Sequence, residues 1–415
     1  YDPLGVALQR IGISDVTVVR PEILLYRSLD STWNINRLAK PTEQDSAISS
    51  WTIVVRQARL NDARVRIIDS VALRGRERRG TVLPDSAVDY ANVLLEDVQL
   101  SGGAEIGSQA LSVRIDALEG MLRHPDIRIK SLAALFRMTR NVVSVEGLKI
   151  ETDRTRISGD ASLGADLAHL SRLSDLERAP VLVDFRANPL DLRELRQFLY
   201  PAVEFLDQEV SLNITGRGTF GNLSVDRLSL QTPRSFIQLR GQIVNLHRPQ
   251  DLTLDLEGGE SLANSDDIRS LLPGISIPDW RRFGDVRFFA SFKGRPASEF
   301  DAHVFALSER GTVDARASLT LGSLFTYKGS ARLKDFDLGG FIGDGTEMTA
   351  LSGVVTFDGS DTDLRRIIGG GRADLDSSDV SGVALGRTVA VLNAAEGTYG
   401  LTVSSQAPLG RLRGS

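Results

Sequence analysis

The residue types that most often carry out catalysis or bind metals are few and scattered in this chain of 415 residues. It contains no cysteine, which excludes disulfides, thiolate metal ligands and a cysteine nucleophile. Its sequence has no HExxH pair, no GxSxG elbow and no pair of carboxylates in a context that suggests acid–base catalysis. The four histidines are widely separated: His124, His169, His247 and His303. We therefore expect no catalytic residue, no metal and no cofactor, and a protein that is not an enzyme.

Two stretches of the sequence resemble ligand-binding motifs, one for a dinucleotide and one for calcium. Residues 216–221 match GxGxxG, but the dinucleotide motif needs a helix after it, and the apolar alternation of Leu223 to Leu230 predicts a strand. A β-turn is the better interpretation. Residues 358–363 have the composition of a calcium loop but lack its glycine at the sixth position and its distal glutamate, so we expect a solvated turn.

Charge and composition exclude further classes. The net charge is −5 and no basic stripe follows the chain, which argues against a nucleic-acid partner. One basic cluster, at 74–79, is expected to be a solvated turn. No apolar run approaches the ~18 residues of a membrane-spanning helix. The chain begins at Tyr1 without methionine, so we expect a fragment of a longer protein that lacks an amino-terminal anchor.

The elements that must position any site repeat along the chain. Residues 210–216, 286–292 and 353–359 are predicted strands, and helix-like breaks recur at 189–195, 265–272 and 335–342. If Asp191, Asp267 and Asp337 are equivalent, the breaks lie 76 and then 70 residues apart. Such a period predicts a repeat architecture. We expect an amino-terminal β unit at 1–90 and four repeats at 91–180, 181–262, 263–335 and 336–415, the last one truncated.

Strict alternation of apolar and polar residues predicts an all-β fold with few short helices. Leu252, Leu254 and Leu256 face one way, for example, while Thr253 and Asp255 face the other. Such strands form an antiparallel sheet with one apolar face, which must be hidden. Alternation alone leaves two solutions open: a sheet curled around an apolar groove, or a closed sandwich or β-solenoid with a dry core.

Three stretches carry a family resemblance. Residues 11–35, with the box Asp30-Ser31-Thr32-Trp33-Asn34-Ile35, resemble the start of the AsmA-like superfamily, although Ser31 replaces the usual glycine. Residues 143–159 resemble the "L-x-L-x-T-x-x-S-x-I-x-G" strand pair of the TamB branch, and residues 228–241 echo it. The resemblance implies an elongated, repetitive antiparallel β-sheet curled into a taco-shaped groove with an apolar interior. It also implies a periplasmic protein anchored in the inner membrane of a diderm bacterium.

The leading functional hypothesis is a non-enzymatic conduit that carries phospholipid between the inner and outer membranes. Family members are implicated in such transfer, and the TamB branch is linked to a barrel partner, TamA; the anchor and carboxy-terminal domain of that branch are expected to be missing here. Acyl chains would lie on Val210, Leu212, Ile214, Ile237, Leu239, Ile243, Leu252, Leu254 and Leu256.

Two alternatives come from other classes. One is a scaffold that assists assembly of outer-membrane barrel proteins by offering strand edges to their precursors. The other is a carbohydrate-active β-helix enzyme, which would need carboxylates clustered on one face. The Asp and Glu residues are instead scattered across turns.

Overall fold

The computed structural model confirms an all-β fold with few short helices. It describes residues 9–30, 32–34, 51–80, 82–107, 110–165, 176–199, 208–246, 251–271, 279–295, 298–320, 325–342, 349–361, 366–395, 397–407 and 410–414. The chain divides into two compact halves, Tyr1–Leu212 and Asn213–Ser415, called here the amino-terminal and carboxy-terminal halves. Residues 167–176 have an apolar spacing typical of a helix, but they lie almost entirely outside the described residues.

The amino-terminal half begins with an unexpected parallel arrangement. Strands β1 (Arg10–Val19) and β2 (Glu22–Arg27) both pair in parallel with β3 (Thr52–Asp69). The alternation in the sequence marks two separate strands, at 53–56 and 64–68, but this interpretation is wrong: β3 is one strand of 18 residues. Register shifts against β4 after Val55 and Leu60 interrupt its alternation, and Asp62 has a positive φ of 56°. A β-bulge of this kind breaks the sequence pattern without ending the strand.

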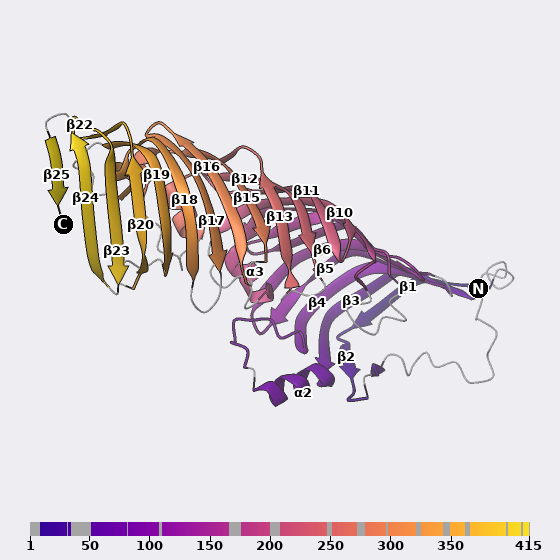
Figure 1. The fold of residues 1–415 in the computed structure, drawn as a ribbon. Coiled ribbons are helices and arrows are strands. Elements are labelled where there is room, and N and C mark those ends of the chain that lie inside the picture. Colours follow the sequence, from indigo (N-terminus) through magenta and orange to yellow (C-terminus); the bar gives the residue numbers. More distant parts are fainter. Residues whose placement is uncertain are drawn as a thin grey trace. The chain divides into compact units, whose positions relative to one another are not determined.

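The rest of this half is an antiparallel meander (Figure 1). Its strands are β4 (Asn92–Ile106), β5 (Ala110–Arg123), β6 (Ile127–Thr139), β7 (Val143–Thr152), β8 (Arg156–Leu163) and β9 (Pro180–Asp191). Helix α3 (Leu192–Leu199) follows β9 directly. A small core forms where Val88, Leu122 and Ile127 pack together with Phe198 of that helix.

The basic cluster at 74–79 is helical, so its assignment to a solvated turn is wrong. It belongs to α2 (Ser70–Arg79). Asp69 caps the first turn by accepting the N–H groups of Val71 and Ala72, each at 3.0 Å. Gly80 ends the helix with a φ of 63°, a left-handed conformation that glycine adopts without strain. Arg76 makes a paired contact with Asp89 at 2.7 and 2.8 Å, which holds the helix against the following loop.

The carboxy-terminal half is an antiparallel sheet in which nearly every strand pairs with the next (Figure 1). Strand β10 (Glu209–Thr219) contains the boundary between the halves. The others are β11 (Asn222–Gln231), β12 (Phe236–Val244), β13 (Thr253–Gly258), β14 (Ser261–Ala263), β15 (Val286–Gly294), β16 (Phe300–Ser308), β17 (Gly311–Thr320), β18 (Thr326–Phe336), β19 (Thr349–Ser360), β20 (Ile368–Leu375), β21 (Ser378–Val380), β22 (Val383–Leu385), β23 (Thr388–Ala395), β24 (Thr398–Ala407) and β25 (Gly410–Gly414). Short helices interrupt it: α4 (Ser265–Leu271), η4 (Arg281–Phe283) and α5 (Leu338–Ile342).

The helical breaks repeat more regularly than the sequence suggested. The residues that cap α3, α4 and α5 are Asp191, Asn264 and Asp337, which accept N–H groups of the first helical turn. They lie 73 residues apart at each step (191, 264 and 337). Taking Asp267 as the middle member was therefore wrong. Asp267 is the third residue of its helix and corresponds to Glu194.

A second contact confirms the corrected alignment. The Thr152 hydroxyl donates to Glu194 at 2.8 Å, and the Thr232 hydroxyl donates to Asp267 in the same way. In both repeats a tight turn between two strands is thus tied to the third residue of the helix. Because α3 and α4 are each bound to the turn of the preceding hairpin, each helix is held beside the sheet.

Candidate apolar groove of the carboxy-terminal half

The strand register gives this sheet one apolar face. Residues directly opposite each other in an antiparallel pair point to the same side, so they form rows that cross the strands. One row contains only alanine and valine: Ala290, Val304, Ala315, Ala331, Val355, Ala373, Ala390 and Val403. The next row, on the opposite face, is mostly polar: Ser291, His303, Arg316, Ser330, Thr356, Arg372, Val391 and Thr402.

The polar face is a solvated surface with local ion pairs. His303 Nε2 lies 2.7 Å from Asp314 in a half-buried pair, and Lys293 lies 3.0 Å from Asp255 in an exposed one. The hydrogen bond from Lys293 to Asp255 raises the pKa of that ammonium group. Exposed pairs of this kind contribute little to stability. This face of the sheet is therefore solvated, whereas the opposite face is apolar.

Short helical segments between the strands cover part of the apolar face. Phe283 of η4, Phe336 at the end of β18 and Phe341 of α5 form a triangle with ring centroids 5.4, 5.5 and 6.0 Å apart. Phe283 and Phe336 are buried. Tilted and edge-to-face aromatic pairs at these distances are favourable beyond the burial itself. We call η4 and α5 the roof segments.

A β-bulge aims Phe336 into this triangle. Strict alternation after Leu333 would turn residue 335 toward the apolar face. The register against β19 shifts between Leu333 and Phe336, and Asp335 has a positive φ of 51°. The extra residue turns Phe336 inward and leaves Asp335 exposed.

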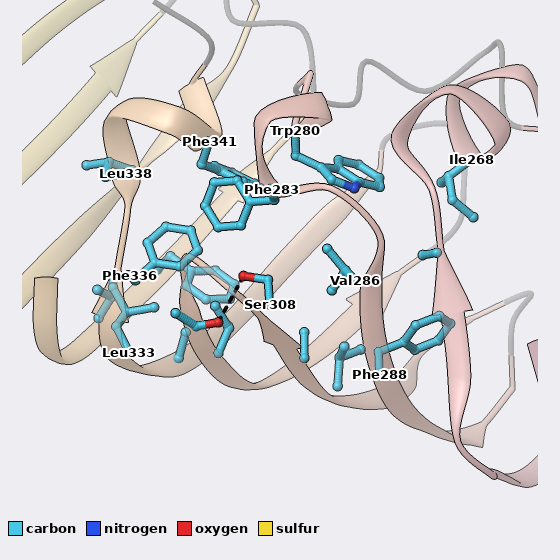
Figure 2. A pocket seen from close by; sticks show the side chains of 18 residues that line it. Ile268, Trp280, Phe283, Val286, Phe288, Ser308, Leu333, Phe336, Leu338 and Phe341 are labelled. Carbon is cyan, nitrogen blue, oxygen red and sulfur yellow. Dashed lines mark hydrogen bonds between the residues drawn. The ribbon is translucent and has the colours of Figure 1, made fainter. Parts of the chain in front are cut away.

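Between the roof segments and the sheet lies an open cavity of about 630 Å³. Figure 2 shows Trp280, Phe283 and Phe341 above it and Val286, Phe288, Ser308 and Leu333 on the strands below. A second cavity of about 400 Å³ continues over β19, β20, β23 and β24. The two share four lining residues: Leu333, Leu338, Val355 and Phe357. Together they form one apolar groove that crosses the strands of this half.

Buried polar contacts hold the roof in place. Asp337 accepts hydrogen bonds from Arg310 at 2.7 Å, from the Gly340 N–H at 3.1 Å and from Thr349 at 3.3 Å. Burial raises the pKa of Asp337, but the hydrogen bonds from Gly340, Arg310 and Thr349 outweigh it and keep that pKa below its ordinary value. A charged Asp337 is thus part of the folded roof.

The predicted groove residues lie outside the two cavities, and most share the apolar face. Ile243 lies opposite Leu254, and Leu256 lies opposite Phe292 of β15. Ile237 and Leu239 lie an even number of residues from Ile243 on β12, so they point to the same face. Leu252 lies two residues before Leu254, just ahead of β13, and is half-buried. Of the three residues on β10, Val210 is buried and Leu212 and Ile214 are half-buried; Val210 and Leu212 fall in the amino-terminal half.

Sequence reasoning missed the aromatic residues that shape the cavity. Trp280, Phe283, Phe336 and Phe341 lie in or beside the helical breaks, where no strand alternation marks a face. One signal was available: ten of the sixteen phenylalanines lie between Phe283 and Phe357. This concentration, in a chain with 6% aromatic residues, coincides with the larger cavity.

Other candidate sites have plain structural roles. Residues 216–221 run from β10 through a turn into β11, so the β-turn prediction is confirmed. Residues 358–360 are the last residues of β19, so the solvated-turn prediction is wrong for them; Asp361 follows the strand, and 362–363 lie outside the described part of the chain. The part of the chain with described coordinates contains no group of three or more His, Asp or Glu residues placed to bind a metal. Nor does any helix in it have the length and apolar character needed to cross a membrane.

No protein-family model, curated protein or solved structure matches this chain. The resemblance to the AsmA-like superfamily therefore rests on the sequence motifs alone.

Proposed function

We propose that the carboxy-terminal half holds the acyl chains of phospholipids in its apolar groove. The observation that carries this proposal is the composition of the larger cavity: sixteen of its eighteen lining residues have no polar side-chain atom. A concave site without polar anchors suits an aliphatic chain and offers little to a sugar, nucleotide or peptide backbone. Each methylene transferred from water into such a groove contributes about 0.8 kcal/mol.

We further propose that the groove serves as a conduit for phospholipid between the inner and outer membranes, with the protein in the periplasm. The continuity of the two cavities supports passage, because a chain can move from one to the other along shared walls. The periplasmic location, the inner-membrane anchor, the two membranes and a TamA-like partner rest on the family resemblance.

Photo-crosslinking in cells tests lipid binding directly. A photoreactive residue at Leu333, which lines both cavities, should capture phospholipid. The matched control is Arg332, the exposed neighbour on the opposite face of β18, which should capture none. Lipid captured equally at both positions would contradict binding in the groove. Capture of an unfolded barrel protein at Leu333, with no lipid, would favour the scaffold function instead.

A further inference from the structure

The larger cavity contains one unused hydrogen-bond donor. Only Trp280 and Ser308 among its lining residues carry a polar side-chain atom. Ser308 is fully engaged, because its hydroxyl donates to the Gly311 carbonyl at 3.1 Å and accepts the Arg310 N–H at 3.1 Å. Trp280 Nε1 is shielded from solvent and has no hydrogen-bond partner among the described residues. Figure 2 shows the indole above the strands, with its nitrogen on the edge that faces them.

Trp280 also lies at a boundary between apolar and charged surroundings. Its neighbour Arg281 points to solvent and forms ion pairs with Asp279 and, at 3.8 Å, with Asp266. Phe283, two residues further on, is buried in the aromatic triangle. Tryptophan favours such boundaries because its ring is apolar and its N–H needs a partner. In a phospholipid, the ester groups occupy the same boundary, between the apolar chains and the polar headgroup.

We propose that Trp280 Nε1–H donates a hydrogen bond to an acyl ester carbonyl, so that the groove selects ester-linked lipids. This inference rests on the proposed lipid binding. An ester carbonyl brought into this cavity loses its water and must find another donor. Among the described side chains that line the cavity, no other has a donor to spare. Because Nε1 is covered in the structure, the indole or the side chains around it must shift to expose the N–H when the carbonyl binds.

The test compares two ligands and two proteins. The ligands are dioctanoyl phosphatidylcholine and its dioctyl ether analogue, which keeps the chains and headgroup but lacks the carbonyls. The proteins are the parent chain and Trp280→Phe, which keeps an aromatic ring and removes the N–H. For the ester lipid we expect Trp280→Phe to weaken binding about fivefold, the usual value of one neutral hydrogen bond. For the ether lipid we expect equal binding by the two proteins, which also shows that the variant is folded.

A spectroscopic readout accompanies the binding data. The chain has three tryptophans, so replacing Trp33 and Trp51 by phenylalanine leaves Trp280 as the only indole. Its emission should shift with the ester lipid more than with the ether lipid. Equal loss of both ligands in Trp280→Phe would assign Trp280 to packing and overturn the proposal. If the parent chain binds neither lipid, the proposed lipid binding itself fails.

Discussion

Asp337 shows how one buried carboxylate can hold the roof of the groove. The side chain is 7% exposed and collects hydrogen bonds from a guanidinium, two backbone N–H groups and a hydroxyl. Removing such a charge leaves donors from three residues without their acceptor, and each unpaired buried group costs free energy. Contacts of this kind repeat at α3 and α4, where Asp191 and Asn264 are the caps and the turn residues Thr152 and Thr232 bond to Glu194 and Asp267.

We expect Asp337→Asn to lower the free energy of unfolding by about 1–3 kcal/mol at pH 7. The folded pKa of Asp337 lies below its unfolded value, so its stabilisation is present above the unfolded pKa, near 3.9, and is lost as pH falls through the folded pKa. The difference between parent and variant should therefore shrink below about pH 4. Urea unfolding at several pH values measures it. Asp358→Asn, an exposed carboxylate on β19, is the control and should have little effect.

The residue scale also shows where sequence reasoning reaches its limit. Alternation predicts that residue 335 faces inward, but the bulge places Phe336 there instead. The sequence likewise suggested that Asp267 is the position equivalent to Asp191 in the next repeat, because both are aspartates within a helical break. Their roles differ, since one is the third residue of its helix and the other is a cap. Such assignments depend on backbone geometry, which residue type alone does not determine.

At the scale of elements, the strands of the carboxy-terminal half follow directly from their alternation. Rows of residues on β15 to β24 stay in register, so the face assigned on one strand extends to its neighbours. The parallel pairing of β1 and β2 with β3 was not predictable in this way. Alternation favours antiparallel pairing in general, but it does not identify the individual strands that pair in parallel.

Adjacent residues on β18 give a matched test of the two faces. Ala331 is buried on the apolar face, and Ser330 is exposed on the polar one. Ala331→Asp should lower the free energy of unfolding by about 2–4 kcal/mol, because it places a carboxylate among apolar side chains. Ser330→Asp places a carboxylate opposite Arg316 and should change the free energy of unfolding by less than about 0.5 kcal/mol. Thermal unfolding of the two variants compares them, and equal losses would show that the faces are not distinct.

At the scale of the whole chain, the repeat is a step of 73 residues between helix caps. Within the carboxy-terminal half, the step from α4 to α5 adds strands to the sheet and a second helix, so the apolar face extends without a new core. The sequence predicted this architecture from its period, although the helical breaks were aligned three residues too far along in one repeat. The depth of the groove was not predictable, because it depends on aromatic residues contributed by the breaks themselves.

A conduit differs from a simple binding pocket in that every lipid must pass each point along it. Val355 lines both cavities, so Val355→Arg should place a charge in the middle of the groove and impose a barrier on the order of several kcal/mol. Photoreactive residues at Phe288, in the first cavity, and Leu392, in the second, report on the two sides. We expect lipid capture to persist on the side that loads and to fall on the other.

The control for this experiment is Val354→Arg, on the polar face of the same strand. Val354 is 40% exposed and lies opposite Asp374, so an arginine there meets water and a carboxylate. Capture at Phe288 and Leu392 should then match the parent chain. If Val355→Arg leaves capture unchanged on both sides, each cavity loads independently, and the groove is a lipid-binding surface without passage along it. Loss on one side only is the result that a conduit requires, because a binding surface gives no reason for one position to depend on another.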